Sequence, residues 1–119
     1  MHEMSLAINI YHLALEEAQK NNCNKLLRIK VEYGVLAGIM GEALEFCFNS
    51  LIVNTIHADA KFELLEKPIQ FRCNLCNLSY SSFNKSSIWD PCPNCGEIIG
   101  HEILGGQELV LTQIEACTV

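Results

Sequence analysis

Four cysteines are the residues of this chain whose spacing most directly indicates chemistry. They form two Cys-x-x-Cys pairs with fifteen residues between them, at Cys73, Cys76, Cys92 and Cys95. A Cys-x-x-Cys turn brings two thiolates to one side of a metal ion, and two such turns complete a tetrahedron of sulfur ligands. Because four sulfurs leave no open coordination position, we expect a single structural zinc ion.

The same cysteines admit two other interpretations. An iron–sulfur cluster is also held by four thiolates, and a free or redox-active thiol pair needs only one Cys-x-x-Cys unit. Disulfides are not expected, because the chain has seven cysteines, an odd number, and no secretory signal is visible. Gly96 directly follows the second pair and permits the positive φ that a chain turning around a metal often needs.

A second group of possible metal ligands lies at the N-terminus. The α-amine of Met1, the amide nitrogen of His2 and the His2 imidazole can close two small chelate rings around one ion. Glu3 can add its amide nitrogen or its carboxylate. Such a nitrogen-rich set favours nickel(II) or copper(II) over zinc. A histidine near a terminus is usually only solvated, so spacing alone does not decide between a metal ligand and a surface residue.

Hydrophobic periodicity predicts the elements that position these groups. Apolar residues at helical spacing, with Met4, Ile8 and Tyr11 on one face, favour a first helix, and alternation of Leu27, Ile29 and Val31 favours a strand. Little of residues 69–101 is periodic. The expected elements are two helices and three strands, at residues 4–20 and 41–53 (helices) and 26–35, 61–66 and 107–115 (strands).

The fold class that we predict is therefore α+β, with two helices packed on a small three-stranded sheet and an inserted zinc-ribbon-like module. Residues 1–66 plus 104–119 would form a nickel-binding domain, and residues 67–103 an inserted four-cysteine zinc-binding domain. The inserted stretch has too few apolar residues for a core of its own. Zinc binding supplies roughly 10–16 kcal/mol of folding free energy to peptides of this kind, which would replace the core.

Charge and motif content argue against several functions. The net charge is −6, and the basic and acidic residues between Lys67 and Glu102 cancel, so no basic stripe is available for a phosphate backbone. We find no catalytic triad, phosphate-binding glycine loop or H-E-x-x-H motif, and we expect no enzyme activity. No apolar run approaches the ~20 residues that span a bilayer, so we expect a cytoplasmic protein. A zinc-ribbon module that binds nucleic acid or protein is the alternative function.

The order of motifs along the whole chain resembles the HypA/HybF family of hydrogenase nickel-incorporation proteins. The resemblance includes the two Cys-x-x-Cys pairs, the second of them with proline as Cys-Pro-x-Cys. The other matching segments are Met1-His2-Glu3, Ile29-Lys30-Val31-Glu32-Tyr33-Gly34, Glu42-Ala43-Leu44-Glu45-Phe46-Cys47-Phe48 and Gly106-Gln107-Glu108-Leu109-Val110-Leu111-Thr112-Gln113-Ile114-Glu115.

The resemblance implies a nickel metallochaperone for assembly of [NiFe]-hydrogenase and, in some organisms, of urease. It implies nickel at His2 with help from Glu3, and zinc at the four cysteines. The implied partners are a hydrogenase-maturation GTPase, the hydrogenase large subunit and urease accessory proteins. We expect no nucleic-acid or membrane partner, and a monomer or weak dimer. Some members carry an acidic residue near the nickel before the second helix; here Met40 stands at that place, close to Glu42.

Overall fold

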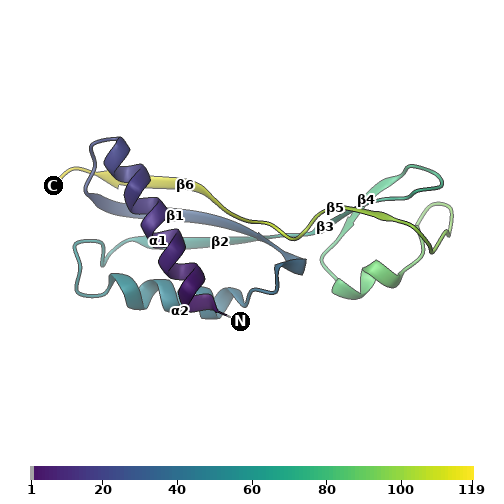
Figure 1. Cartoon of the computed structure of the whole chain (residues 1–119), viewed down its shortest axis with the longest axis horizontal. Helices are drawn as coiled ribbons and strands as arrows, with labels where there is room; N and C mark the ends of the chain where they lie inside the picture. Colours follow the sequence, from purple (N-terminus) through teal and green to yellow (C-terminus); the bar gives the residue numbers. More distant parts are fainter. Residues whose placement is uncertain (1) are drawn as a thin grey trace. The chain divides into compact units, whose positions relative to one another are not determined.

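The computed structural model describes residues 2–119, which form an α+β structure as the sequence predicts. Its strands make two three-stranded sheets, ordered β2-β1-β6 and β4-β3-β5 (Figure 1). Short 3-10 helices lie at Val35–Ala37 and Lys85–Trp89. The helices and strands of the described residues are α1 (Glu3–Lys20), β1 (Lys25–Gly34), α2 (Gly41–Ile52), β2 (Lys61–Lys67), β3 (Ile69–Arg72), β4 (Ser79–Ser82), β5 (Glu102–Gly105) and β6 (Leu109–Cys117).

Contacts divide the chain into two compact units. Unit 1 comprises Met1–Glu32, Ile39–Leu65 and Leu109–Val119, and unit 2 comprises Tyr33–Gly38 and Glu66–Glu108. Residues 33–38, 66 and 104–108 thus belong to unit 2, although the sequence predicted them to be part of the nickel-binding domain. Backbone bonds account for this, because Gly34 N–H donates to the Glu108 carbonyl and Leu36 N–H to that of Gly106. The assignment of one metal to each part stays a prediction.

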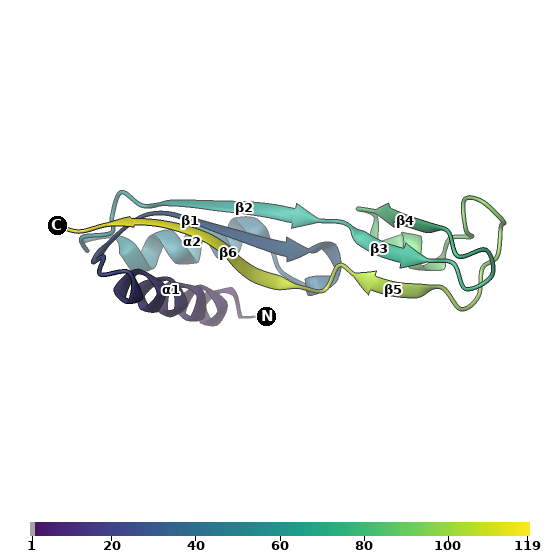
Figure 2. The same ribbon diagram turned by 90° about the horizontal axis from the view of Figure 1, so that it is seen from above.

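Both helices of unit 1 lie on the same face of the β2-β1-β6 sheet (Figure 2). The buried face of α1 is made of Ala7, Ile10, Ala14 and Ala18, which follow one another at steps of three and four residues. Three of these four are alanines, which let a helix approach its neighbours closely. Of the residues expected on this face, Tyr11 packs against the core, whereas Met4 is 42% exposed, so the prediction for Met4 is wrong. Neither helix is long and apolar enough to cross a membrane, as far as residues 2–119 are concerned.

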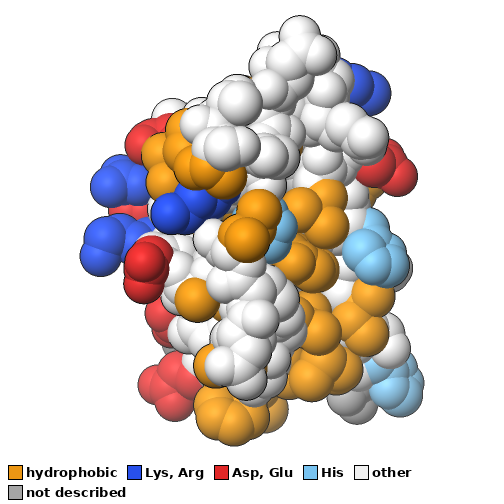
Figure 3. All heavy atoms as spheres, turned by 90° about the vertical axis from the view of Figure 1, so that its left-hand side faces the viewer, with side chains coloured by type: hydrophobic (Ala, Val, Ile, Leu, Met, Phe, Trp, Pro, Cys, Tyr) orange, Lys and Arg blue, Asp and Glu red, His pale blue; other side chains and the backbone are white. Residues whose placement is uncertain are grey.

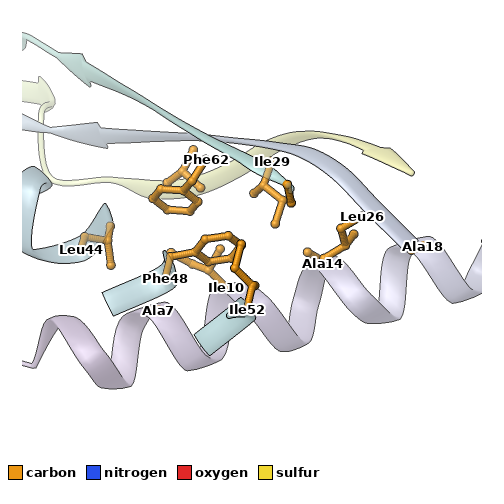
Figure 4. Close-up of a cluster of buried hydrophobic side chains, with 12 residues drawn as sticks. Ala7, Ile10, Ala14, Ala18, Leu26, Ile29, Leu44, Phe48, Ile52 and Phe62 are labelled. Atoms are coloured by element: carbon orange, nitrogen blue, oxygen red, sulfur yellow. The ribbon is translucent and has the colours of Figure 1, made fainter. Parts of the chain in front are cut away.

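The core of unit 1 is centred on aromatic side chains. Phe48 of α2 is fully buried and stacks on Phe62 of β2 with ring centroids 4.3 Å apart. Tyr11 of α1 meets Phe48 edge-on at 6.0 Å. Aliphatic side chains from α1, β1 and α2 surround these rings (Figure 4). This core fixes α1 and α2 against the sheet, and with them the start of each helix.

Strand β1 departs from the predicted alternation at its beginning. Leu26 is fully buried while Leu27 is 41% exposed, although Ile29 and Val31 are buried as expected. Two buried residues three positions apart, Leu26 and Ile29, mean that strict alternation is interrupted between them. The prediction that Leu27 belongs to the core face is therefore wrong.

Unit 2 is held by a much smaller apolar cluster. Phe71 of β3 stacks on Tyr80 of β4 at 4.9 Å, and Ile69 and Val35 complete the buried group. Strand β3 pairs antiparallel with both β4 and β5. The sequence predicted no strands here, because four-residue strands such as Ser79–Ser82 carry almost no hydrophobic pattern.

Candidate metal centre

The sulfur atoms of Cys73, Cys76, Cys92 and Cys95 form one cluster in unit 2, all within 4.8 Å of one another. Cys73 Sγ lies 3.6 Å from Cys95 Sγ, and Cys76 Sγ lies 3.7 Å from Cys92 Sγ. Four sulfurs placed about 2.3 Å from a central ion, as in a zinc tetrahedron, are about 3.8 Å apart. Two of the six sulfur separations thus match a zinc tetrahedron, and none of the others exceeds 4.8 Å.

The two Cys-x-x-Cys turns have the same backbone construction. In the first, Cys73 N–H donates to the Leu78 carbonyl at 2.9 Å and Asn77 N–H donates to the Cys73 carbonyl at 3.0 Å. In the second, Cys92 N–H donates to Glu97 at 2.8 Å and Gly96 N–H to Cys92 at 3.0 Å. Each turn is thus closed by the same pair of hydrogen bonds. The first turn precedes β4, and the second follows the second 3-10 helix.

A left-handed residue follows each pair of cysteines. Gly96 has φ of 79°, in the region that the sequence analysis anticipated for it, and Asn77 has φ of 62° at the equivalent place in the first turn. Asparagine tolerates this region better than most residues other than glycine. The role of Asn77 was not foreseen, although an asparagine directly after Cys-x-x-Cys is the available sequence signal.

Backbone amides point at the sulfurs that are most enclosed. The N–H groups of Leu75 and Asn94 donate to Cys73 Sγ and Cys92 Sγ, each at 3.4 Å. Cys73 and Cys92 are buried, whereas Cys95 is exposed. Amide donors stabilise the negative charge that thiolates keep when they bind a metal.

The four cysteine thiols do not lose their protons equally. A side-chain hydrogen bond from Asn94, followed by a backbone bond from Leu78, lowers the pKa of Cys76 to about 6. The pKa of Cys95 is raised to about 12: a backbone hydrogen bond from Glu97 favours its thiolate, but partial loss of hydration and hydrogen bonds with the three neighbouring sulfurs favour its thiol. Metal binding must therefore release protons from this cluster, which is the usual behaviour of thiolate sites.

The predicted nickel ligands lie in unit 1 at the start of α1. His2 is exposed and is the N-cap of the helix, its carbonyl accepting the first helical bond from Leu6 N–H at 3.0 Å. Met1, whose α-amine the predicted chelate uses, lies outside the described residues. The backbone N–H groups of His2 and Glu3 precede Leu6, the first residue whose N–H donates within the helix. They therefore make no hydrogen bond to a carbonyl of the helix.

Glu3 is held by the beginning of α2. Its Oε2 accepts a hydrogen bond from the backbone N–H of Met40 at 3.2 Å. This bond is the main cause that lowers the pKa of Glu3, with its own backbone amide second, so the carboxylate is ionised. The loop before α2 thus contributes a main-chain amide at Glu3, while the side chain of Met40 is 69% exposed.

The other histidines have different surroundings. Ring Nδ1 of His57 accepts a hydrogen bond from Leu26 N–H at 3.0 Å, and the residue is only 7% exposed, a role that the sequence did not indicate. His57 belongs to the loop between α2 and β2. Figure 3 views unit 1 from the end that carries this loop, and hydrophobic and charged side chains both reach the surface there. His101 packs edge-on against Tyr80 in unit 2. Within residues 2–119 the four cysteines form the one group of three or more possible metal ligands.

With this geometry established, comparison with known proteins identifies the family. Residues 1–116 match the family model described as hydrogenase/urease nickel incorporation, metallochaperone, HypA. The chain belongs to the HypA family. The match covers both the cysteine cluster and the N-terminal His2-Glu3 pair, as the resemblance in the sequence suggested.

Individual members of the HypA family are similar over nearly their whole length. The hydrogenase maturation factor HypA of Solidesulfovibrio magneticus is 31% identical over 115 residues, covering 97% of this chain and 98% of that protein. The HypA of Lawsonia intracellularis is 34% identical over 116 residues, covering 97% and 98%.

Solved structures of the HypA family share the fold. The solution structure of the Ni metallochaperone HypA from Helicobacter pylori superposes with a TM-score of 0.66 at 21% identity, covering all of both chains. A second solution structure of a HypA protein gives 0.69 at 21% identity, covering 100% of this chain and 98% of the other.

Proposed function

We propose that this protein is a nickel metallochaperone for maturation of [NiFe]-hydrogenase, and of urease where the organism has one. The observation that carries this proposal is membership of the HypA family across residues 1–116, with His2 and Glu3 at the start of that match. A metallochaperone binds and releases its cargo without turning over a substrate. We therefore expect no enzyme activity.

Zinc is the metal that we assign to the four cysteines. Tetrahedral sites with four sulfur ligands hold either zinc or an iron–sulfur centre, and the sulfur separations of 3.6 and 3.7 Å suit one small ion. Zinc there would be structural, because a filled sulfur shell leaves no position for another ligand. Unit 2 has few buried apolar side chains, so the ion would supply much of its stability.

Nickel is assigned to the N-terminus. The His2 imidazole, the backbone nitrogens beside it and the Glu3 carboxylate form a nitrogen-rich set that suits nickel(II). His2 is exposed at the helix start, so a partner could reach the ion and remove it. The positive end of the α1 dipole disfavours a cation, but deprotonated amides and the Glu3 carboxylate offset that effect. Since amides must lose protons to bind, nickel affinity should fall as the pH is lowered.

The partners that we propose are a hydrogenase-maturation GTPase, the hydrogenase large subunit as recipient, and urease accessory proteins in organisms that make urease. Zinc in unit 2 would hold a rigid surface on which a partner can dock. The nucleic-acid alternative is not favoured, since the two segments of unit 2 together carry three Lys or Arg residues against five Asp or Glu residues. Four thiolates around one zinc(II) would add two further negative charges.

Nickel titration by calorimetry tests the assignment. Zinc-loaded native protein should bind one nickel ion, and His2→Ala should abolish that binding. His12→Ala is the matched control, because His12 is exposed on the same helix, and it should bind nickel as the native protein does. Nickel binding that survives His2→Ala unchanged would overturn the proposed site. An N-terminal extension tests the α-amine separately: unchanged affinity would remove the amine from the ligand set.

A further inference from the structure

A main-chain hydrogen bond joins the N-terminal ends of the two helices of unit 1. The donor is the N–H of Met40 at the N-cap of α2, and the acceptor is Oε2 of Glu3, the first residue of α1, 3.2 Å away. From this geometry we infer that the Met40 amide is a positioning group for nickel. Its hydrogen bond engages Oε2 of Glu3, which leaves Oε1 as the carboxylate oxygen that binds the metal. The inference rests on the nickel site proposed above.

The Met40 amide is available for this purpose because of its place in α2. The first backbone bond of that helix runs from Leu44 N–H to the Met40 carbonyl at 3.0 Å, so the Met40 N–H lies before the helical ladder. N–H groups at a helix start need an acceptor from outside the helix. The carboxylate of Glu3 provides that acceptor from a segment 37 residues earlier in the chain.

The consequence for metal binding is a carboxylate that is ordered before the ion arrives. A glutamate side chain loses much rotational freedom when it becomes a ligand, and a bond that already fixes it reduces that loss. Groups that orient a metal ligand typically contribute 10- to 100-fold in metal affinity. With one oxygen committed to the amide, Glu3 contributes a single oxygen to nickel and takes up less of the coordination sphere.

Residue 40 acts here through its backbone, which makes the inference testable by substitution. The Met40 side chain is 69% exposed, so Met40→Ala keeps the N–H and removes little packing. Met40→Pro removes the N–H. Its φ of −91° is close to the value of about −65° that proline imposes, and position 40 precedes the first helical residue, Gly41. The two variants therefore differ mainly in the one hydrogen bond.

The experiment compares nickel affinity of the zinc-loaded native chain, Met40→Ala and Met40→Pro, each with Glu3 intact and with Glu3→Ala. With Glu3 intact, Met40→Pro should bind nickel about tenfold more weakly than Met40→Ala, which should stay within about twofold of the native protein. With Glu3→Ala, the two position-40 variants should bind equally. Equal affinities with Glu3 intact, or an undiminished difference in the Glu3→Ala chain, would overturn the inference.

Hydrogen exchange at the Met40 amide supplies a measurement that does not depend on the proline variant folding. The amide should be protected in the native chain with and without nickel, and should lose protection in Glu3→Ala. If nickel exposes the Met40 amide to exchange, Oε2 has left it and the inference is wrong. A native chain that binds no nickel at His2 would refute the proposed function and this inference together. Normal nickel binding with equal Met40→Pro and Met40→Ala affinities refutes the inference alone.

Discussion

Nδ1 of His57 accepts a hydrogen bond from the backbone N–H of Leu26, 3.0 Å away and 31 residues earlier in the chain. The acceptor role requires that this nitrogen carry no proton, so the bond exists only while the imidazole is neutral. Burial, and secondarily the charge of Lys25, lowers the pKa of His57 below its usual value. This pair ties the loop between α2 and β2 to the start of β1.

We predict that the free energy of unfolding decreases below about pH 6.5, because the unfolded chain takes up a proton at His57 before the folded chain does. Above that pH the residue is neutral in both states and its contribution is complete. His57→Asn should reduce this pH dependence, since an amide oxygen can accept from Leu26 at every pH. Chemical unfolding between pH 5.5 and 7.5 with zinc present measures the effect, and equal slopes for both proteins would contradict it.

Two phenylalanines of α2 should differ sharply in their importance. Phe48 is fully buried against Phe62 and Tyr11, so Phe48→Ala should cost about 3–5 kcal/mol of unfolding free energy. Phe46, two positions earlier, is 73% exposed, and Phe46→Ala should cost less than about 0.5 kcal/mol. Denaturant unfolding of both variants measures the two losses of unfolding free energy. Comparable losses would contradict the burial of Phe48 in the core.

Gly34 should not tolerate a side chain, for steric reasons alone. Its φ of −87° and ψ of 153° suit any residue, but a Cβ atom would lie 2.1 Å from the carbonyl carbon and oxygen of Gly106. We expect Gly34→Ala to destabilise unit 2 by more than about 2 kcal/mol. Gly105→Ala is the control, because its Cβ would make an ordinary contact of 3.6 Å with Gln70. Thermal unfolding of the zinc-loaded proteins should separate the two, and similar midpoints would refute the close approach.

Loss of one sulfur should unfold unit 2 selectively. Cys73→Ser removes a buried member of the cluster, and the small apolar group around Phe71 and Tyr80 cannot compensate for a lost zinc ion. Amide NMR signals of unit 2 should lose their dispersion while those of unit 1, which has its own core, remain. Cys23→Ser changes a thiol outside the cluster and should leave both sets unchanged. Retention of zinc and of unit 2 dispersion in Cys73→Ser would refute a structural role for this site.

The elements of unit 1 were predictable because hydrophobic periodicity creates them. The second helix was expected at residues 41–53 and is Gly41–Ile52, and the strand expected at 61–66 is Lys61–Lys67. Periodicity was less reliable for choosing the buried face. Helix α1 buries small alanines, including Ala7 and Ala14, which a search for large apolar side chains passes over.

Unit 2 was harder to predict because a cluster of four cysteines takes the place of hydrophobic patterning. The cysteine spacing identified the cluster, but not β3, β4 and β5, whose short polar strands depend on tertiary context. The two contacts of greatest functional interest, from Met40 to Glu3 and from Leu26 to His57, were equally hidden. Each connects backbone on one segment with a side chain more than thirty residues away. No local pattern in the sequence encodes such a pair.

The central claim is that nickel and zinc occupy separate sites, nickel at His2 and zinc at the four cysteines. Metal analysis of protein loaded with both ions tests it most directly, using native chain, His2→Ala and Cys73→Ser. We expect one nickel and one zinc per native chain, loss of nickel alone in His2→Ala, and loss of zinc with nickel retained in Cys73→Ser. Nickel that remains in His2→Ala but disappears in Cys73→Ser would contradict it.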